Sequence, residues 1–210
     1  NLLLNLFSQA NDSEIWTEIE EALNKISNRE RFNKALVETR ATLYRLAGQY
    51  DVSIEQLESA IVRFPWDIRL REYYVELNFL AGLDHEDKAI SENPYWNNAV
   101  SVYHDMISDL EYIRSLPYAA RYASRDYRIP ATIGYRVGQI YYLAGEFDHA
   151  ATAFRRVLFV PVDEQQNKMI SVWYLAALQK QGKSDASIYN RLIEKYPDID
   201  AEITNIVNIN

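Results

Sequence analysis

The chain has 210 residues, of which 48% are hydrophobic, and its formal net charge is −8. This apolar fraction supplies a core and disfavours disorder, while the acidic balance disfavours general binding to nucleic acid or anionic membranes, because phosphate neutralisation needs clustered Lys and Arg. The absence of cysteine excludes disulfides, thiolate metal sites and cysteine nucleophiles. Six glycines and six prolines are sparse for an all-β chain, which needs many tight turns.

The sequence contains no candidate membrane-spanning segment. No apolar run approaches the roughly 20 residues that a transmembrane helix requires. The opening stretch NLLLNLF is too short, and no basic segment precedes it as in a signal peptide. Because the chain begins with Asn1 and not Met, we expect a trimmed or processed chain from which targeting information is missing. The composition fits an exported bacterial protein and a cytosolic one equally well.

A recurring tripeptide, Leu-Ala-Gly, indicates an internal repeat. It ends at Gly48, Gly82 and Gly145. Gly48 and Gly82 are 34 residues apart, and Gly145 and Gly182 are 37 apart. The 63 residues between Gly82 and Gly145 are close to two such units. A period of this length is typical of helical repeat proteins, and here it is regular at both ends and interrupted in the middle.

The first predicted element is a helix within 11–29. Asn11 and Glu14 have the spacing of a capping box, in which two side chains satisfy backbone N–H groups at a helix start. Apolar residues then recur at intervals of three and four. We expect this helix to cap the N-terminal end of the fold.

The second predicted element is a helical hairpin over 30–65. Its first helix ends at Gly48, since glycine tolerates the left-handed conformation of a helix C-terminus. Asp51 or Ser53 is expected to cap the second helix. Pro65 marks the end of that helix and the start of the next unit.

Residues 66–129 are predicted to form an irregular repeat with an insertion. A first helix runs to Gly82, and the polar stretch DHEDKAISE that follows is a loop or a short helix. Asn93 and Pro94 have the pattern of an N-cap followed by proline at the first helical position. A long amphipathic helix follows and stops at Pro117.

The segment 112–128 contains four arginines and one acid, with tyrosines interleaved among them. Its local charge is therefore +3. One interpretation is an anion-recognition site, in which arginine forks bind carboxylate or phosphate. The other is a structural role, in which the arginines stack on tyrosines and pair with acids of neighbouring helices. The candidate anion-binding residues are Arg114, Arg121, Tyr122, Arg125 and Arg128.

The remainder of the chain continues the same pattern. A regular hairpin is predicted over 130–162 and a degenerate one over 163–197. The last segment, 198–210, has isoleucines on one helical face. We expect this terminal helix to cover the exposed core of the last repeat.

The two regular hairpins resemble the tetratricopeptide repeat (TPR) family. That family has a helix–turn–helix unit of 34 residues with a Trp-x2-Leu-Gly-x2-Tyr, Ala-x3-Phe and Pro pattern. The matching residues of 130–162 are Val137-Gly138, Tyr141, Gly145, Phe147, Ala150-x3-Phe154 and Pro161. Those of 30–65 are Ala41, Tyr44, Gly48, Tyr50, Ser53-x3-Leu57, Ala60 and Pro65. The tryptophan position departs from the pattern, with Val37 and Gly134 in its place.

This resemblance implies an all-α fold: a right-handed α-solenoid of about three to four TPR-like hairpins, forming a single domain over 1–210 with an irregular centre and capping helices. It also implies a concave groove lined by the first helices, which binds a peptide or a helix of a partner protein. The positions that correspond to the groove are Arg45, Arg69, Glu72, Glu76, Phe79, Tyr135, Gln139 and Tyr142. The alternative for Phe79 and Tyr142 is that they pack between repeats.

The sequence carries no recognisable catalytic motif. Its histidines, His85, His104 and His149, show no HxxxH spacing, and no phosphate-binding or nucleophile-elbow motif is present. We therefore expect a non-catalytic scaffold with a protein or peptide partner, without cofactor or metal. An anionic-ligand or small-molecule binding protein that uses 112–128 is the alternative. The oligomeric state stays open.

Overall fold

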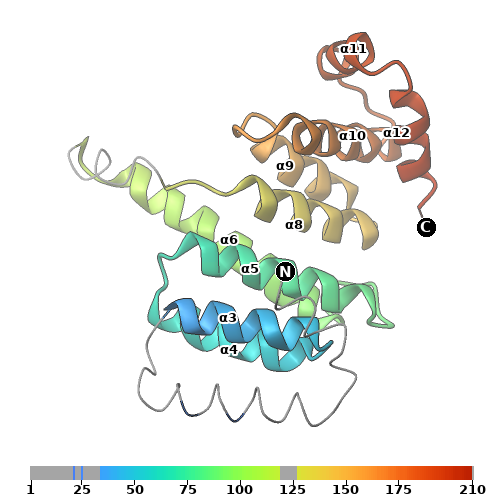
Figure 1. Ribbon diagram of the computed structural model, residues 1–210. Coiled ribbons are helices and arrows are strands. Elements are labelled where there is room, and N and C mark those ends of the chain that lie inside the picture. Colours follow the sequence, from blue (N-terminus) through green and yellow to red (C-terminus); the bar gives the residue numbers. More distant parts are fainter. Residues whose placement is uncertain (1–20, 22–24, 26–33, 119–126, 210) are drawn as a thin grey trace. The chain divides into compact units, whose positions relative to one another are not determined.

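The computed structural model describes residue 21, residue 25, 34–118 and 127–209. All regular secondary structure in these ranges is helical, which confirms the predicted all-α class. The helices are α3 (Lys34–Leu46), α4 (Tyr50–Arg63), α5 (Ile68–Leu83), α6 (Pro94–Ser115), α8 (Ala131–Leu143), α9 (Phe147–Val157), α10 (Glu164–Lys180), α11 (Ala186–Lys195) and α12 (Ile199–Val207) (Figure 1). None of these helices is both long and apolar enough to span a bilayer.

The chain divides into two compact units, Asn1–Leu77 and Asn78–Asn210, with the boundary inside α5. The predicted capping helix over 11–29, including Asn11 and Glu14, lies outside the described residues except for Glu21 and Lys25, which are helical.

Three helix–helix turns are built in the same way, around a glycine with positive φ. Gly48, Gly145 and Gly182 have φ of 73°, 80° and 68°. After Gly48, the N–H of Gln49 donates to the carbonyl of Tyr44 at 2.9 Å, and the Gly48 N–H donates to the carbonyl of Arg45 at 3.0 Å. The same pair of bonds recurs at the other two glycines. This arrangement satisfies carbonyls at the helix end and favours glycine, which has no Cβ to clash.

In the first unit, α3 packs against α4. Ala41 of α3 and Leu57 and Ala60 of α4 are buried. The predicted cap of α4 was wrong. Gln49, and neither Asp51 nor Ser53, occupies the N-cap, and its side chain makes no capping hydrogen bond. The buried Ser53 hydroxyl instead donates to the carbonyl of Ala41 at 2.6 Å and so joins the two helices.

The third Leu-Ala-Gly does not form a turn. Gly82 lies inside α5, and the helix continues to Leu83. A Cβ at Gly82 would overlap the indole of Trp96, which is fully buried. The glycine therefore serves close packing between α5 and α6, and the interval from Gly48 to Gly82 does not separate two equivalent turns.

The start of α6 matches the sequence prediction. The Asn93 side chain accepts a hydrogen bond from the N–H of Trp96 at 3.1 Å, and Pro94 is the first helical residue. The Asn93 amide also donates to the carbonyls of Gly82 and Asp87, each at 3.0 Å. Residues 84–92 form an irregular loop, and α6 ends at Ser115, two residues before Pro117.

In the second unit, α9 packs against both α8 and α10, and α8 also contacts α10. Two glycines of α8 permit the close approach of α9. A Cβ on Gly134 would overlap the side chain of Val157, and one on Gly138 would lie 2.5 Å from the ring of Phe154. Phe154, which is fully buried, fills the space between the helices.

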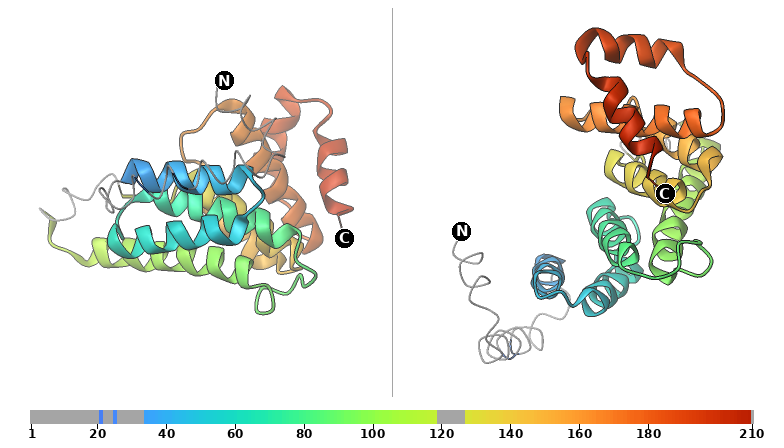
Figure 2. Two further views of the ribbon diagram at one scale, coloured as in Figure 1. Left: turned by 60° about the horizontal axis from the view of Figure 1, so that its bottom comes forward. Right: turned by 90° about the vertical axis from the view of Figure 1, so that its right-hand side faces the viewer.

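The C-terminal helices do not repeat this arrangement. α10 packs more extensively against α12 than against α11, and Figure 2 shows α12 beside α10. α12 lies within the predicted terminal segment, 198–210, and its Ile199 and Ile203 are buried. α11 buries Ile188 and Leu192. α11 contacts α10 less extensively than α12 does, and two pockets are lined by residues of α11.

Candidate functional site

The predicted groove residues of the first unit lie on α3 and α5. Arg45 is half-buried on α3. Arg69, Glu72 and Glu76 follow each other on α5 at helical spacing, with the Arg69 side chain 77% exposed. The Arg69 guanidinium lies 3.9 Å from the carboxylate of Glu38, a weak surface pair.

Three predicted groove residues of the second unit lie around Arg136, a residue that the sequence analysis did not name. They are Phe79, Tyr135 and Gln139. The guanidinium of Arg136 lies 4.6 Å from the ring centroid of Phe79 and 5.5 Å from that of Tyr135. It donates to the Gln139 carbonyl oxygen at 2.9 Å, and the Gln139 amide donates to the Tyr135 hydroxyl at 3.2 Å. Phe79 and Gln139 are buried, so this cluster presents mainly Tyr135 and Arg136, which are half-buried.

Tyr142 lies in the interior. Its ring makes edge contacts with Phe147 and Trp173, both at 5.2 Å between centroids. Its hydroxyl donates to the carbonyl of Ile206 in α12 at 3.0 Å, and burial raises the pKa of Tyr142 to about 12. α12 thus covers the position at which the repeat pattern placed a groove residue. Phe79 and Tyr142 occupy the packed positions that the alternative interpretation gave them.

The predicted anion-binding segment is described only at its ends. Arg114 and Arg128 are exposed, and the Tyr127 hydroxyl donates to the Asp109 carboxylate at 2.7 Å. The central residues, Arg121, Tyr122 and Arg125, lie outside the described residues.

Each of the three histidines lies within hydrogen-bonding distance of a different residue. His104 Nε2 and the Tyr141 hydroxyl are 2.9 Å apart. His149 Nδ1 lies 2.8 Å from a carboxylate oxygen of Glu146, and His85 Nδ1 accepts the N–H of Asp87 at 3.2 Å. Among the described residues, no three His, Cys, Asp or Glu side chains converge as a metal site would require.

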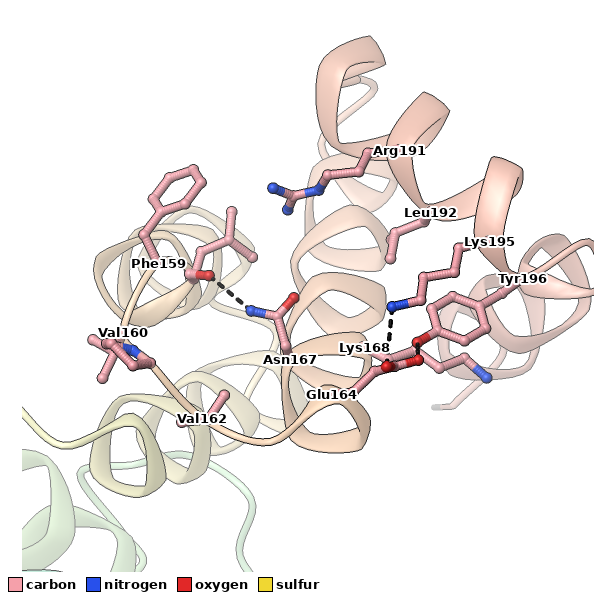
Figure 3. A pocket seen from close by; sticks show the side chains of 12 residues that line it. Phe159, Val160, Val162, Glu164, Asn167, Lys168, Arg191, Leu192, Lys195 and Tyr196 are labelled. Atoms are coloured by element: carbon pink, nitrogen blue, oxygen red, sulfur yellow. Dashed lines mark hydrogen bonds and ion pairs between the residues drawn. The ribbon is translucent and has the colours of Figure 1, made fainter.

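A pocket of about 520 Å³ lies where α11 stands away from α10 (Figure 3). The α9–α10 connection forms one side, the N-terminal part of α10 forms the floor, and the C-terminal end of α11 forms the other side. Its lining residues are Leu158, Phe159, Val160, Pro161, Val162, Glu164, Asn167, Lys168, Arg191, Leu192, Lys195 and Tyr196. Three of them are cationic and one is anionic, in a chain whose net charge is −8.

One end of this pocket is closed by a hydrogen-bonded network around Glu164. The carboxylate accepts the Tyr196 hydroxyl at 2.5 Å and the Lys195 ammonium at 3.0 Å. The hydrogen bond from Tyr196, followed by that from Lys195, lowers the pKa of Glu164. The same contacts to Glu164 raise the pKa of Lys195 and of Tyr196.

The other polar groups near the floor are also engaged. Lys168 pairs with Glu202 of α12 at 2.5 Å, and its ammonium lies 4.8 Å from the Tyr196 ring centroid. The Asn167 amide donates to the carbonyl of Leu158 at 3.2 Å. These contacts join α10 to α12 and to the α9–α10 connection, so the side chains on the floor of the pocket are fixed by hydrogen bonds and ion pairs within the chain.

Phe159 and Arg191 differ from the rest of the lining. Phe159 is 71% exposed, so its ring is open to solvent at the edge of the pocket. Arg191 is exposed and forms no hydrogen bond or ion pair with any residue for which the structure gives a position. Figure 3 shows the two on facing sides of the pocket. Sequence reasoning missed both. The available signal was the i,i+4 spacing of Arg191 and Lys195, which puts two cations on one face of a helix.

Comparison with protein-family models, with curated proteins and with solved structures found no match to this chain.

Proposed function

We propose that this chain is a non-catalytic, TPR-like scaffold that binds a segment of a partner protein. The pocket lined by Phe159 and Arg191 carries the proposal. An exposed aromatic ring across a pocket from a cation without a partner in the described structure is a composition that protein interfaces favour, since aromatic residues and Arg are enriched there.

The packing of the helices supports the TPR-like part of the proposal. The glycine turns at Gly48 and Gly145 follow the first helix of each regular hairpin. In the second unit α9 contacts both its own partner α8 and the following helix α10, which is the order of contacts expected of stacked hairpins. On this basis we propose that the hairpins continue as a right-handed α-solenoid with capping helices at both ends.

The binding surface that we propose differs from the groove implied by the repeat pattern. In the second unit Phe79, Gln139 and Tyr142 are buried and cannot reach a partner without unpacking the helices. Phe159 and Arg191 are already exposed, so a partner could reach them without such a cost.

Site-specific photo-crosslinking tests this function. The full chain would carry benzoylphenylalanine in place of Phe159 and be irradiated in an extract of the source organism. We expect one protein to crosslink reproducibly, and we expect the yield to fall when Arg191→Glu is added. Val62, which is 79% exposed in the first unit, is the matched control position. Equal crosslinking from positions 62 and 159, or a crosslinking yield that does not change with Arg191→Glu, would rule out the pocket as the partner site.

A further inference from the structure

The charge of the pocket points to an anionic group on its occupant. Each of two lining cations already has a carboxylate: Lys195 pairs with Glu164 and Lys168 pairs with Glu202. Arg191 is left without a counter-ion in the described part of the chain. A guanidinium binds a carboxylate through two parallel hydrogen bonds, which makes such a group the natural ligand for Arg191.

A second pocket in the same unit differs in that its charged groups have partners within the chain. That pocket, of about 480 Å³, is lined by Lys183, Asp185 and Asp200 among others. The Asp185 carboxylate accepts the hydroxyl of Tyr174 at 3.3 Å, and Lys183 pairs with Asp148 at 3.0 Å. Asp200 accepts the hydroxyl of Tyr189 at 2.9 Å. Its charged groups are satisfied from within the chain, whereas Arg191 is not.

The apolar part of the pocket points to a chain segment and not to a free anion. Phe159 is 71% exposed, and Leu192, which is buried in the wall of α11, faces the same hollow. A small free anion would leave the Phe159 ring in water, whereas an aromatic or aliphatic side chain would cover it. A volume of about 520 Å³ accommodates both a carboxylate and such a side chain.

We propose that this pocket recognises an acidic, apolar segment of a partner protein: an Asp or Glu carboxylate pairs with Arg191, and a neighbouring aromatic or aliphatic side chain packs between Phe159 and Leu192. The inference rests on the function proposed above and specifies the chemistry of the partner. A nucleic acid does not fit, because a polyphosphate needs several cations that lack partners, whereas two of the three lining cations, Lys168 and Lys195, are already paired with carboxylates.

A random library of twelve-residue peptides, displayed on phage and selected on the full chain, tests the inference while the partner is still unidentified. Enriched peptides would be synthesised, and their Kd measured by fluorescence anisotropy on wild type, Arg191→Glu and Phe159→Ala. Both residues are exposed, so both variants are expected to keep the wild-type circular dichroism spectrum. The matched controls are Arg69→Glu, whose side chain is 77% exposed, and Val62→Ala, whose residue is 79% exposed.

The expected result is a shared acidic residue next to an aromatic or aliphatic one. We expect Kd to rise roughly tenfold or more in Arg191→Glu and in Phe159→Ala, because a charge-assisted hydrogen bond or a buried ring contributes at least that factor. The Arg69→Glu and Val62→Ala variants should bind as wild type does.

Other outcomes overturn the inference in distinguishable ways. Peptides that require Phe159, share no acidic residue and bind Arg191→Glu as they bind wild type would leave the scaffold function standing and remove the acidic partner. The absence of any peptide that depends on Phe159 or Arg191 would remove both proposals. Binding lost in Arg69→Glu alone would move the site to the predicted groove. Self-association of the wild type, detected by light scattering and abolished in Arg191→Glu, would make a second copy of the chain the occupant.

Discussion

Replacing Gly138 with Ala should destabilise the second unit, although alanine is the better helix former. In the folded structure the new Cβ would lie 2.5 to 2.7 Å from three ring carbons of Phe154. Phe154 is fully buried and cannot swing into solvent, so α8 and α9 must move apart. Overpacking of this kind costs about 1–3 kcal/mol, and removing a helical glycine returns about 1 kcal/mol. We expect a net loss of up to about 2 kcal/mol in the free energy of unfolding.

Urea unfolding of the full chain, followed by circular dichroism, would measure this loss, and a double-mutant cycle with Phe154→Leu would assign it. Leucine lacks the ring carbons that the new methyl group meets. We therefore expect Gly138→Ala to cost about 1 kcal/mol less in the Phe154→Leu background than in wild type. A variant Gly138→Ala at least as stable as wild type, or one whose cost is the same in both backgrounds, would refute the steric argument.

Gly145→Ala is the matched control for this cycle. Gly145 has φ of +80° and has no neighbouring atom within 4 Å of a built Cβ. Its substitution should cost about 1–2 kcal/mol through the left-handed backbone alone. That cost should not change when Phe154 is replaced.

Two other substitutions examine the C-terminal helices. Tyr142→Phe removes the hydrogen bond to α12 while keeping the ring, so it should lower the free energy of unfolding by about 1 kcal/mol and speed hydrogen exchange in α12; unchanged exchange there would contradict the role given to this contact. Tyr196→Phe removes the largest cause of the lowered pKa of Glu164, so that pKa should rise, as measured by carbon-13 NMR titration. A carboxyl group whose pKa is lowered in the folded state stabilises the fold above its unfolded pKa of 4.5, and this stabilisation is lost as pH falls through the folded pKa. The Glu164–Lys195 pair should therefore break at higher pH in this variant. An identical titration would show that the Tyr196 hydroxyl does not hold the carboxylate.

The sequence alone determined the all-α class and several helix ends. Gly48, Gly145 and Gly182 stand at the three Schellman-type turns, and Asn93 with Pro94 starts α6. These features were predictable because they depend on neighbouring residues: a positive φ at one glycine, or one side chain bonded to a backbone N–H three residues on.

What only the tertiary structure decided depends on which helices meet. Gly82 carries the same tripeptide as Gly48, but the indole of Trp96 makes it a packing residue. Ser53 is a residue type that often caps helices, but its hydroxyl donates a hydrogen bond to the carbonyl of Ala41 in the other helix of the hairpin. Local sequence cannot distinguish these uses, because the deciding atom lies 12 or more residues away.

The candidate site shows the same division. The repeat pattern placed Tyr142 in a groove, yet it lies under α12, which packs more extensively against α10 than α11 does. That choice depends on the summed burial of Ile199, Ile203 and other apolar residues against α10, which no periodicity within one helix specifies. α11 contacts α10 less extensively, and the pocket of Phe159 and Arg191 is lined by residues of both helices and of the α9–α10 connection.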